Sequence, residues 1–118
     1  PTTWTPTYSA KGTMTWTSIT TAYARYWPNA QSKMIAFGLR ASGTIGGTLN
    51  DRVYFTPPVA FVNNLWPFAC YVSDNGTIIG GCAYNNGSSG IIEISRYDFA
   101  NFSAGTLIVY VSGVAEAS

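Results

Sequence analysis

Polar and apolar residues alternate one by one in parts of this chain, and this alternation limits the fold more than any other sequence feature. Over residues 13–17, Thr13, Thr15 and Thr17 alternate with Met14 and Trp16. Successive side chains of a β-strand point to opposite faces of a sheet, whereas a helix repeats its faces every 3.6 residues. The segment therefore predicts a half-buried strand with Met14 and Trp16 on the buried side.

The same alternation recurs along the chain. Residues 34–40 repeat it, and a third strand is predicted over residues 52–56, where Pro57-Pro58 ends it because proline cannot donate to a strand ladder. The remaining predicted strands are residues 22–27, 67–73, 77–84, 90–97 and 106–112. No segment has a convincing helical period, so about eight short strands are expected.

Turn-forming residues separate the predicted strands. They are Ser42-Gly43, Gly46-Gly47, Asp74-Asn75-Gly76, the segment Asn85 to Gly90, and Ala104-Gly105. Short strands with turn signals between them and no long linker predict one all-β domain over residues 1–118. The expected fold is an antiparallel β-sandwich of about eight strands, of jelly-roll type.

Charged residues make up only 9% of the chain. Six basic and five acidic side chains give a net charge of +1, and the basic residues are dispersed, so nucleic-acid binding is not expected. The absence of histidine excludes Ser-His-Asp and Cys-His nucleophiles and histidine-ligated zinc. The longest uncharged stretch, Val53 to Ser73, is interrupted by prolines and is not expected to insert into a membrane.

Two of the later segments are apolar on both faces. One contains Ile91, Ile92 and Ile94, and the other is the run from Leu107 to Val111. Such a strand is either central in the fold and covered on both sides, or its outer face is buried against another subunit. The low charge leaves little to keep monomers apart, which gives the second explanation equal weight and predicts a homo-oligomer.

The two cysteines, Cys70 and Cys82, lie on either side of the predicted turn at residues 74–76. A hairpin could bring them together as a disulfide, but one residue more or less in the loop would move one of them to the opposite face. We favour two buried thiols, because free cysteine is commonly a small core residue. Two cysteines alone do not make a metal site.

The acidic residues do not suggest an active site. They are Asp51, Asp74, Glu93, Asp98 and Glu116. A glycosidase needs two carboxyl groups that face each other across a sugar, and no spacing here selects such a pair. Glu93 and Asp98 are expected to form ion pairs beside Arg96. The sequence therefore predicts no catalytic or metal-binding residue, no cofactor and no enzyme.

Aromatic residues make up 15% of the chain. Trp16, Phe37 and Phe55 share the phase of the apolar positions and are predicted to pack in the core. Other aromatic residues stand beside amides in predicted loops, where a ring could stack on a sugar and an amide could hydrogen-bond it. These candidate glycan contacts are Trp27, Asn29, Asn63, Asn64, Trp66, Tyr84, Asn85 and Asn86. The simpler alternative for each ring is a loop anchor packed onto the sandwich.

Three groups of residues follow one another in a distinctive order. They are Trp4-Thr5-Pro6-Thr7 with Gly12 to Trp16; Ala24-Arg25-Tyr26 with Met34 to Leu39 and Val53 to Pro58; and Ile94 to Asp98 with Asn101-Phe102 and Ala104 to Gly113. Together they resemble a domain that recurs at the C-termini of bacteriophage tail-fibre, tail-spike and related virion proteins. The resemblance spans almost the whole chain. It implies a small β-sandwich, generally trimeric, that serves in host attachment, assembly or capping.

The expected function is therefore that of a structural module on the surface of a phage particle, on its tail or capsid. It would attach the virion to host-surface glycan as a homotrimer, in contact with other virion proteins, as the C-terminal tip of a longer fibre or spike. One alternative is a capsid decoration, head-fibre, trimerisation or capping module with no ligand. A remote alternative is a polysaccharide-degrading enzyme. The resemblance assigns no ligand-binding residue.

Overall fold

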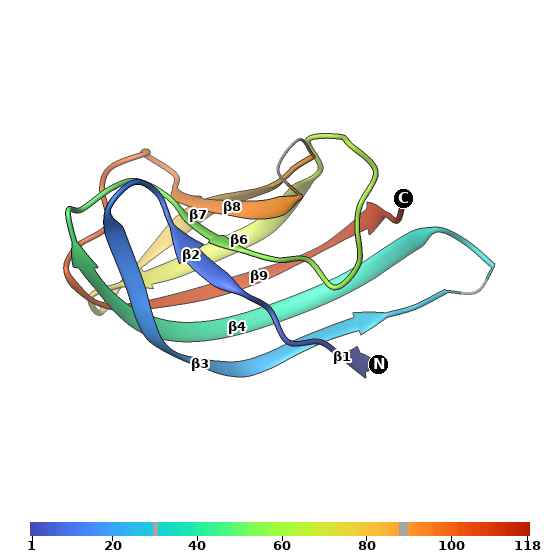
Figure 1. Ribbon diagram of the computed structural model, residues 1–118, viewed down its shortest axis with the longest axis horizontal. Helices are drawn as coiled ribbons and strands as arrows, with labels where there is room; N and C mark the ends of the chain where they lie inside the picture. The colour runs from blue at the N-terminus through green and yellow to red at the C-terminus, as the bar shows by residue number, and fades with distance from the viewer. Residues whose placement is uncertain (30, 88–89) are drawn as a thin grey trace.

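The computed structural model describes residues 1–29, 31–87 and 90–118 and shows an all-β fold (Figure 1). The strands are β1 (Thr2–Thr3), β2 (Tyr8–Ala10), β3 (Met14–Trp27), β4 (Met34–Gly47), β5 (Val53–Phe55), β6 (Pro67–Asp74), β7 (Thr77–Asn86), β8 (Ile91–Arg96) and β9 (Gly105–Glu116). Within the described ranges, no helix is present that could cross a membrane.

The strands form one antiparallel sheet in the order β1-β3-β4-β9-β6-β7-β8-β5-β2. The sheet curls into a half-barrel, so that β7 and β8 lie over β9 and β4 (Figure 1). Strand β6 pairs with both β9 and β7 and so joins the two layers. The prediction of an antiparallel all-β fold is confirmed, whereas a sandwich of about eight strands is not, because the nine described strands form one continuous curled sheet.

The N-terminal segment closes both edges of this sheet. Strand β1 pairs with the edge of β3, and β2 pairs with β5 at the opposite edge. The Trp4 indole Nε1–H donates to the carbonyl oxygen of Thr56 at 3.0 Å. The Tyr8 hydroxyl shares a 2.6 Å hydrogen bond with Thr21, and its ring lies edge-on to Trp16 at 5.2 Å. The first ten residues therefore connect strands that are distant in the sheet order.

The core lies on the inner face of the curl, as the alternation predicts. Trp16, Phe37 and Phe55 are buried, which confirms their predicted packing role. Phe37 is central among the aromatic residues, since its ring lies 4.8 Å from that of Phe68 and 6.0 Å from that of Phe61. Burial of such side chains is the main favourable contribution to the folding of a domain of this size.

Two predicted features of the long strands are wrong. The predicted strands at 13–17 and 22–27 are parts of one strand, β3, which bulges near Ser18 at a φ of 54°. The predicted turns Ser42-Gly43 and Gly46-Gly47 lie within β4. A Cβ at Gly43 would stand 2.6 Å from the Ile19 side chain. Glycine is therefore required there by packing between strands, and it does not mark a turn.

The β6–β7 hairpin decides the state of the cysteines. Its loop has two residues, Asn75 and Gly76, both with positive φ, because Asp74 pairs with Thr77. This register places Cys70 opposite Gly81, and Cys82 on the other face of the sheet. Both thiols are free, as expected, but both cysteines are half-buried and not fully buried as the sequence analysis predicted. Burial, with a smaller contribution from Cys82, raises the pKa of the Cys70 thiol to about 12.

Arg96 forms the ion pairs that hold the loop after β8. Its guanidinium bonds both carboxylate oxygens of Asp98, at 3.0 and 2.9 Å, and reaches the buried Asp74 at 3.0 Å. The hydrogen bond from Arg96, followed by that from the Ala100 N–H, lowers the pKa of Asp98. The predicted pairing of Asp98 is confirmed. The pairing of Glu93 with Arg96 is wrong, because the two side chains point to opposite faces of β8 and Glu93 contacts Arg52 instead.

Candidate functional site

The candidate glycan contacts fall into two groups at one end of the molecule (Figure 1). The first group joins the loop between β5 and β6 to the end of β7 and comprises Asn63, Asn64, Trp66, Tyr84, Asn85 and Asn86. The second group, Trp27 and Asn29, belongs to the hairpin between β3 and β4. Of the predicted turn from Asn85 to Gly90, Ser88 and Ser89 lie outside the described residues.

Asn85 fastens the first group together. Its side chain is 1% exposed, and its Nδ2 donates to the carbonyl oxygen of Asn64 at 3.2 Å. The Asn85 backbone N–H donates to the carbonyl oxygen of Trp66 at 2.9 Å. These bonds satisfy polar groups that would be costly to bury alone. The structure therefore places Asn85 as a clamp between the loop and β7, on the inner face of the sheet.

The other residues of this loop present amides more than rings. Asn63 and Asn64 are exposed, whereas Trp66 is half-buried against the core. The Asn64 Oδ1 accepts a 3.1 Å hydrogen bond from the Leu65 N–H, so part of the amide is used to shape the loop. The structure thus brings Asn63, Asn64 and Trp66 together, with the Trp66 ring in the position of a loop anchor.

In the second group, Trp27 is a freely presented ring. It is 48% exposed and pairs with Ala36 on the outer face of the layer formed by β3, β4, β9 and β6, called the long strands below. Asn29 is exposed, but its Oδ1 accepts a 3.0 Å hydrogen bond from the Gln31 N–H, which is a turn contact. This pair therefore offers an aromatic surface without a free amide oxygen beside it.

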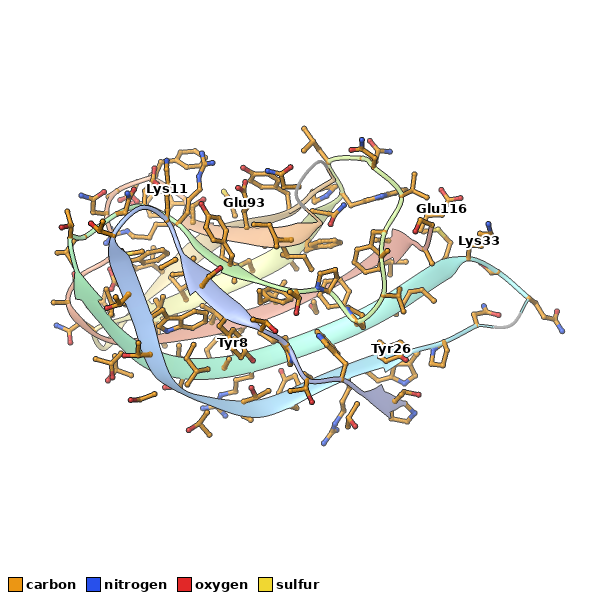
Figure 2. All side chains as sticks on the ribbon, in the orientation of Figure 1. Tyr8, Lys11, Tyr26, Lys33, Glu93 and Glu116 are labelled. Atoms are coloured by element: carbon orange, nitrogen blue, oxygen red, sulfur yellow. The ribbon has the colours of Figure 1, made fainter. Side chains whose placement is uncertain are left out.

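Tyr84 and Asn86 meet around Glu93 on the outer face of the second layer, β7, β8 and β5, called the short strands below. Glu93 is 6% exposed and lies between Tyr84 of β7 and Tyr54 of β5 in the strand register. Figure 2 shows it on the side of β8 away from β9. The Asn86 Nδ2 donates to its Oε1 at 3.4 Å, and the Arg52 Nη1 lies 3.6 Å from its Oε2. The hydrogen bond to Glu93, followed by burial, raises the pKa of Tyr84.

The outer face of the long strands holds an aromatic row that the sequence did not reveal. Tyr71 and Tyr110 stack with ring centres 4.2 Å apart and planes 15° from parallel. The guanidinium of Arg40, on β4, lies 5.1 Å from the Tyr110 ring centre. Tyr23, on β3, pairs with Arg40 in the strand register. The sequence signal was an aromatic or arginine residue in the polar phase of each strand. Only the register between four strands shows that they form one row.

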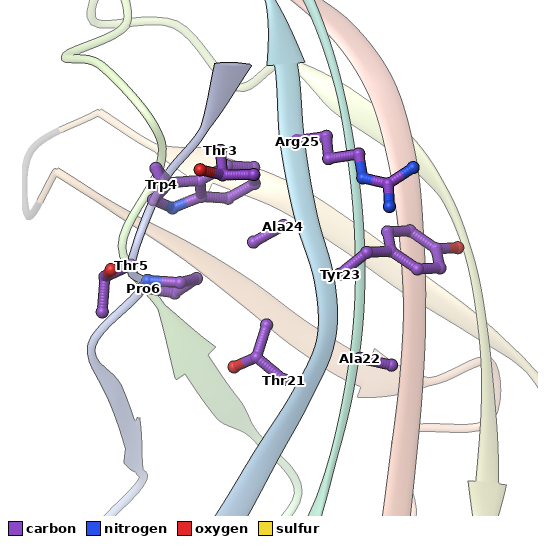
Figure 3. Close-up of a pocket in the computed structure, with 9 residues that line it drawn as sticks. All are labelled: Thr3, Trp4, Thr5, Pro6, Thr21, Ala22, Tyr23, Ala24 and Arg25. Carbon is purple, nitrogen blue, oxygen red and sulfur yellow. The ribbon is translucent and has the colours of Figure 1, made fainter. Parts of the chain in front are cut away.

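Arg25 lies beside this row, two residues beyond Tyr23 on β3 and opposite Gly38. Its guanidinium carbon lies 5.8 Å from the centre of the Tyr23 ring. Figure 3 shows the two side chains together, on the side of β3 away from Trp4. A hollow of about 330 Å³ separates the N-terminal segment from β3 at this point, lined by residues 3–6 and 21–25. No predicted glycan contact lines it.

Exposed apolar groups are concentrated on the same outer face. Of the ten large hydrophobic side chains that are exposed in the described residues, five belong to it: Tyr23, Trp27, Met34, Tyr71 and Val114. A sixth, Ile78 of β7, pairs with Ser73 at the margin of this face. Exposed apolar side chains gathered on one face are typical of a binding site or a subunit interface.

No group of three acidic, cysteine or histidine side chains that could hold a metal ion occurs in the part of the chain that the structure describes. Comparison of the chain with protein-family models, curated proteins and solved structures finds no match. The functional conclusion therefore depends on the chemistry of the outer faces.

Proposed function

We propose that the chain is a structural module of a bacteriophage particle and attaches the particle to glycan on the host surface. The sequence resemblance to virion domains supports this, as does an all-β scaffold that presents aromatic side chains. On this proposal the module acts as a homotrimer, in contact with other virion proteins on the tail or capsid surface.

The exposed aromatic and arginine side chains of the long strands carry the proposal. Tyr23 and Tyr71 are 39% and 46% exposed, and Trp27 is exposed on the same face. Their packing contributes little to the core of a single chain, since the core lies on the other side of the sheet. Planar rings flanked by hydrogen-bond donors are suited to sugar rings, which present C–H groups on one face and hydroxyls at their edges.

The same face has, at its margin, an apolar part suited to contact between copies. Ile78 is 75% exposed and pairs with Ser73, which pairs in turn with Ile108 of β9. Burial of such side chains between subunits is favourable at about 25 cal/mol per Å². Three linked copies would also multiply weak glycan contacts through avidity.

Light scattering of the purified chain at micromolar concentration tests the trimer. We expect about three times the chain mass of 12.7 kDa, and a monodisperse monomer would remove the trimer. Ile78→Asp is expected to dissociate the assembly while leaving the fold intact, because the side chain is exposed. Leu65→Asp, at a loop position 69% exposed, is the matched control and should leave the assembly unchanged.

Glycan-array and whole-cell binding test the attachment function. Binding to a defined set of glycans and to host cells supports it, and flat responses for the purified trimer in both assays would remove it. A trimer that binds no glycan would instead favour the second candidate, a decoration or capping module. The exposed apolar side chain of Ile78 supports that candidate, because it is suited to contact with another protein.

An enzyme that cleaves polysaccharide remains a remote third candidate. Glu93 contacts Arg52 and Asn86, while Asp74 and Asp98 contact Arg96. These carboxylates are engaged by cations, whereas glycosidase chemistry requires two that face each other across a sugar. Release of reducing ends from a bound polysaccharide would restore this candidate.

A further inference from the structure

A hollow of about 260 Å³ lies on the outer face of β6 and β9. Tyr71 and Tyr110 line it on one side, and Tyr23 of β3 reaches it from the neighbouring hairpin. Ala69 and Ser112 also line it. It is therefore open to solvent on the same face as the aromatic row, and it is separate from the predicted loop contacts around Asn85.

The strand register explains why a hollow forms here. One row across the sheet carries long side chains, and the next row carries small ones. The long row is Tyr71, Tyr110, Arg40 and Tyr23, and the small row is Ala69, Ser112 and Gly38. The small side chains, on strands about 4.8 Å apart, leave a low floor. The rings of the long row stand beside it as a wall. Arg25 stands at the end of the floor, opposite Gly38.

None of the described residues that line the hollow is charged, but two arginines flank it, because each lies over a tyrosine ring of its wall. Arg40 stacks on Tyr110 and Arg25 on Tyr23, and the ion pairs of the described residues involve Lys11, Arg52 and Arg96 instead. The acidic residue on this face, Glu116, lies four positions beyond Ser112 along β9, about 13 Å away. Figure 2 shows Glu116 beside Lys33 at the hairpin end. Among the described residues, the two flanking guanidinium groups thus have no carboxylate partner.

We propose that this hollow, together with the two arginines that flank its tyrosine wall, binds an acidic polysaccharide. The exposed ring of Tyr71 packs on a sugar ring, and Arg25 and Arg40 pair with sugar carboxylates, which the arginine fork matches with two parallel hydrogen bonds. Trp27, one row further toward the hairpin, extends the aromatic surface. The inference rests on the proposed glycan attachment and adds its site and the charge of its ligand.

Charge also disfavours a second copy of the chain as the occupant of the hollow. Copies packed through this row, in a pair or around the threefold axis of the proposed trimer, would bring their Arg25 and Arg40 side chains together, without an acidic group between them. Like charges opposed across an interface are unfavourable. A polyanion is therefore the better complement to this part of the face, and contact between copies is left to the apolar part around Ile78.

The test is a calorimetric titration of the full chain with two polysaccharides of matched length, polygalacturonate and neutral dextran. We expect polygalacturonate to bind at least about tenfold more tightly than dextran, and its binding to weaken with added salt. Tyr71→Ala and Arg40→Gln should each weaken it about fivefold or more, whereas Tyr71→Phe should retain it. Tyr97→Ala, at a loop position 64% exposed, is the control and should leave it unchanged.

Circular dichroism of each variant separates loss of binding from loss of fold, and exposed positions are chosen for this reason. Equal binding of dextran would overturn the requirement for charge. Host-cell or glycan binding that Tyr71→Ala and Arg40→Gln leave intact would overturn the site while the attachment function stands. Absence of binding to any glycan or cell would overturn both. Dissociation of an oligomer by these variants, with glycan binding unchanged, would identify the row as an interface between copies and overturn the inference.

Discussion

The outward-pointing charged side chains of the two layers of the curled sheet differ in whether they have a partner of opposite charge. On the short strands, Glu93 is nearly buried, and Arg52, Asn86 and the flanking tyrosines surround it. On the long strands, Arg25 and Arg40 lie on tyrosine rings with no acidic partner among the described residues. Both faces are rich in tyrosine, so hydrophobicity does not separate them. The two faces differ in the pairing of their charges. On the short strands the charge is paired within the chain, whereas on the long strands the arginines can pair with a group from another molecule.

The largest effect is expected at the inner face that both layers share. Val109 is 0% exposed in β9, and Val109→Asp would bury an uncompensated charge at a cost of several kcal/mol. We expect no cooperative thermal transition by circular dichroism. Val114→Asp, on the outer face of the same strand, should fold. A soluble Val109→Asp protein with an unaltered transition would show that the inner face of β9 is wrongly assigned.

The second largest effect tests the ion pair between Arg52 and Glu93 on the short strands. Arg52→Met should lower the free energy of unfolding by about 1–3 kcal/mol, because it leaves the Glu93 carboxylate buried without its cation. Urea denaturation measures this loss. The double variant with Glu93→Gln should recover part of it. A single variant as stable as the parent chain would mean that Glu93 does not depend on Arg52.

A smaller effect is expected for the corresponding change on the long strands. Arg40→Met removes a guanidinium that stacks on Tyr110 at an exposed position, and it should cost less than about 1 kcal/mol in the same denaturation assay. The contrast with Arg52→Met is the measurement of interest. Equal losses at the two positions would remove the distinction between the faces.

The smallest effect is expected in the reactivity of the two thiols, which chemical labelling measures. At pH 8, iodoacetamide should modify Cys82 before Cys70, because Cys70 has a pKa of about 12 and stays protonated. Its ordinary pKa is 9.0, so the unfolded chain loses this proton first, and stability should fall as the pH rises from about 9 to about 12. Cys70→Ala should remove that part of the decline. Peptide mapping that finds both thiols equally modified at pH 8 would contradict the register of the β6–β7 hairpin.

Local patterns in the sequence predicted local structure well. Alternation identified the buried side of Met14 and Trp16, and Pro57 marked the end of β5. The same patterns wrongly predicted a turn at Gly43. Glycine is needed there to leave room for the side chain of Ile19, and the sequence does not show that this side chain lies nearby. The short strands β1 and β2 were also missed, because two or three residues are too few for a periodic signal.

The candidate site shows the same limit. Asn85 and Asn86 are adjacent in sequence, yet one clamps the inner loop and the other reaches Glu93 on the outer face. The phase of a strand is fixed by its pairing, which a single sequence does not contain. The row from Tyr71 to Tyr23 depends on three such pairings at once. The exposure of Trp27 could be expected from its position before a turn, which needs no long-range information, and its contact with glycan stays a prediction.

The N-terminal segment has a consequence for solubility. Strands β1 and β2 each cover a margin of the sheet, so losing the first ten residues would uncover β3 and β5 together. An uncovered strand offers its unpaired peptide groups to other polypeptides, and a chain with so few charges has little repulsion to prevent such growth. The two shortest strands would then guard against fibril formation, and a fragment that lacks them should polymerise although its core residues are intact.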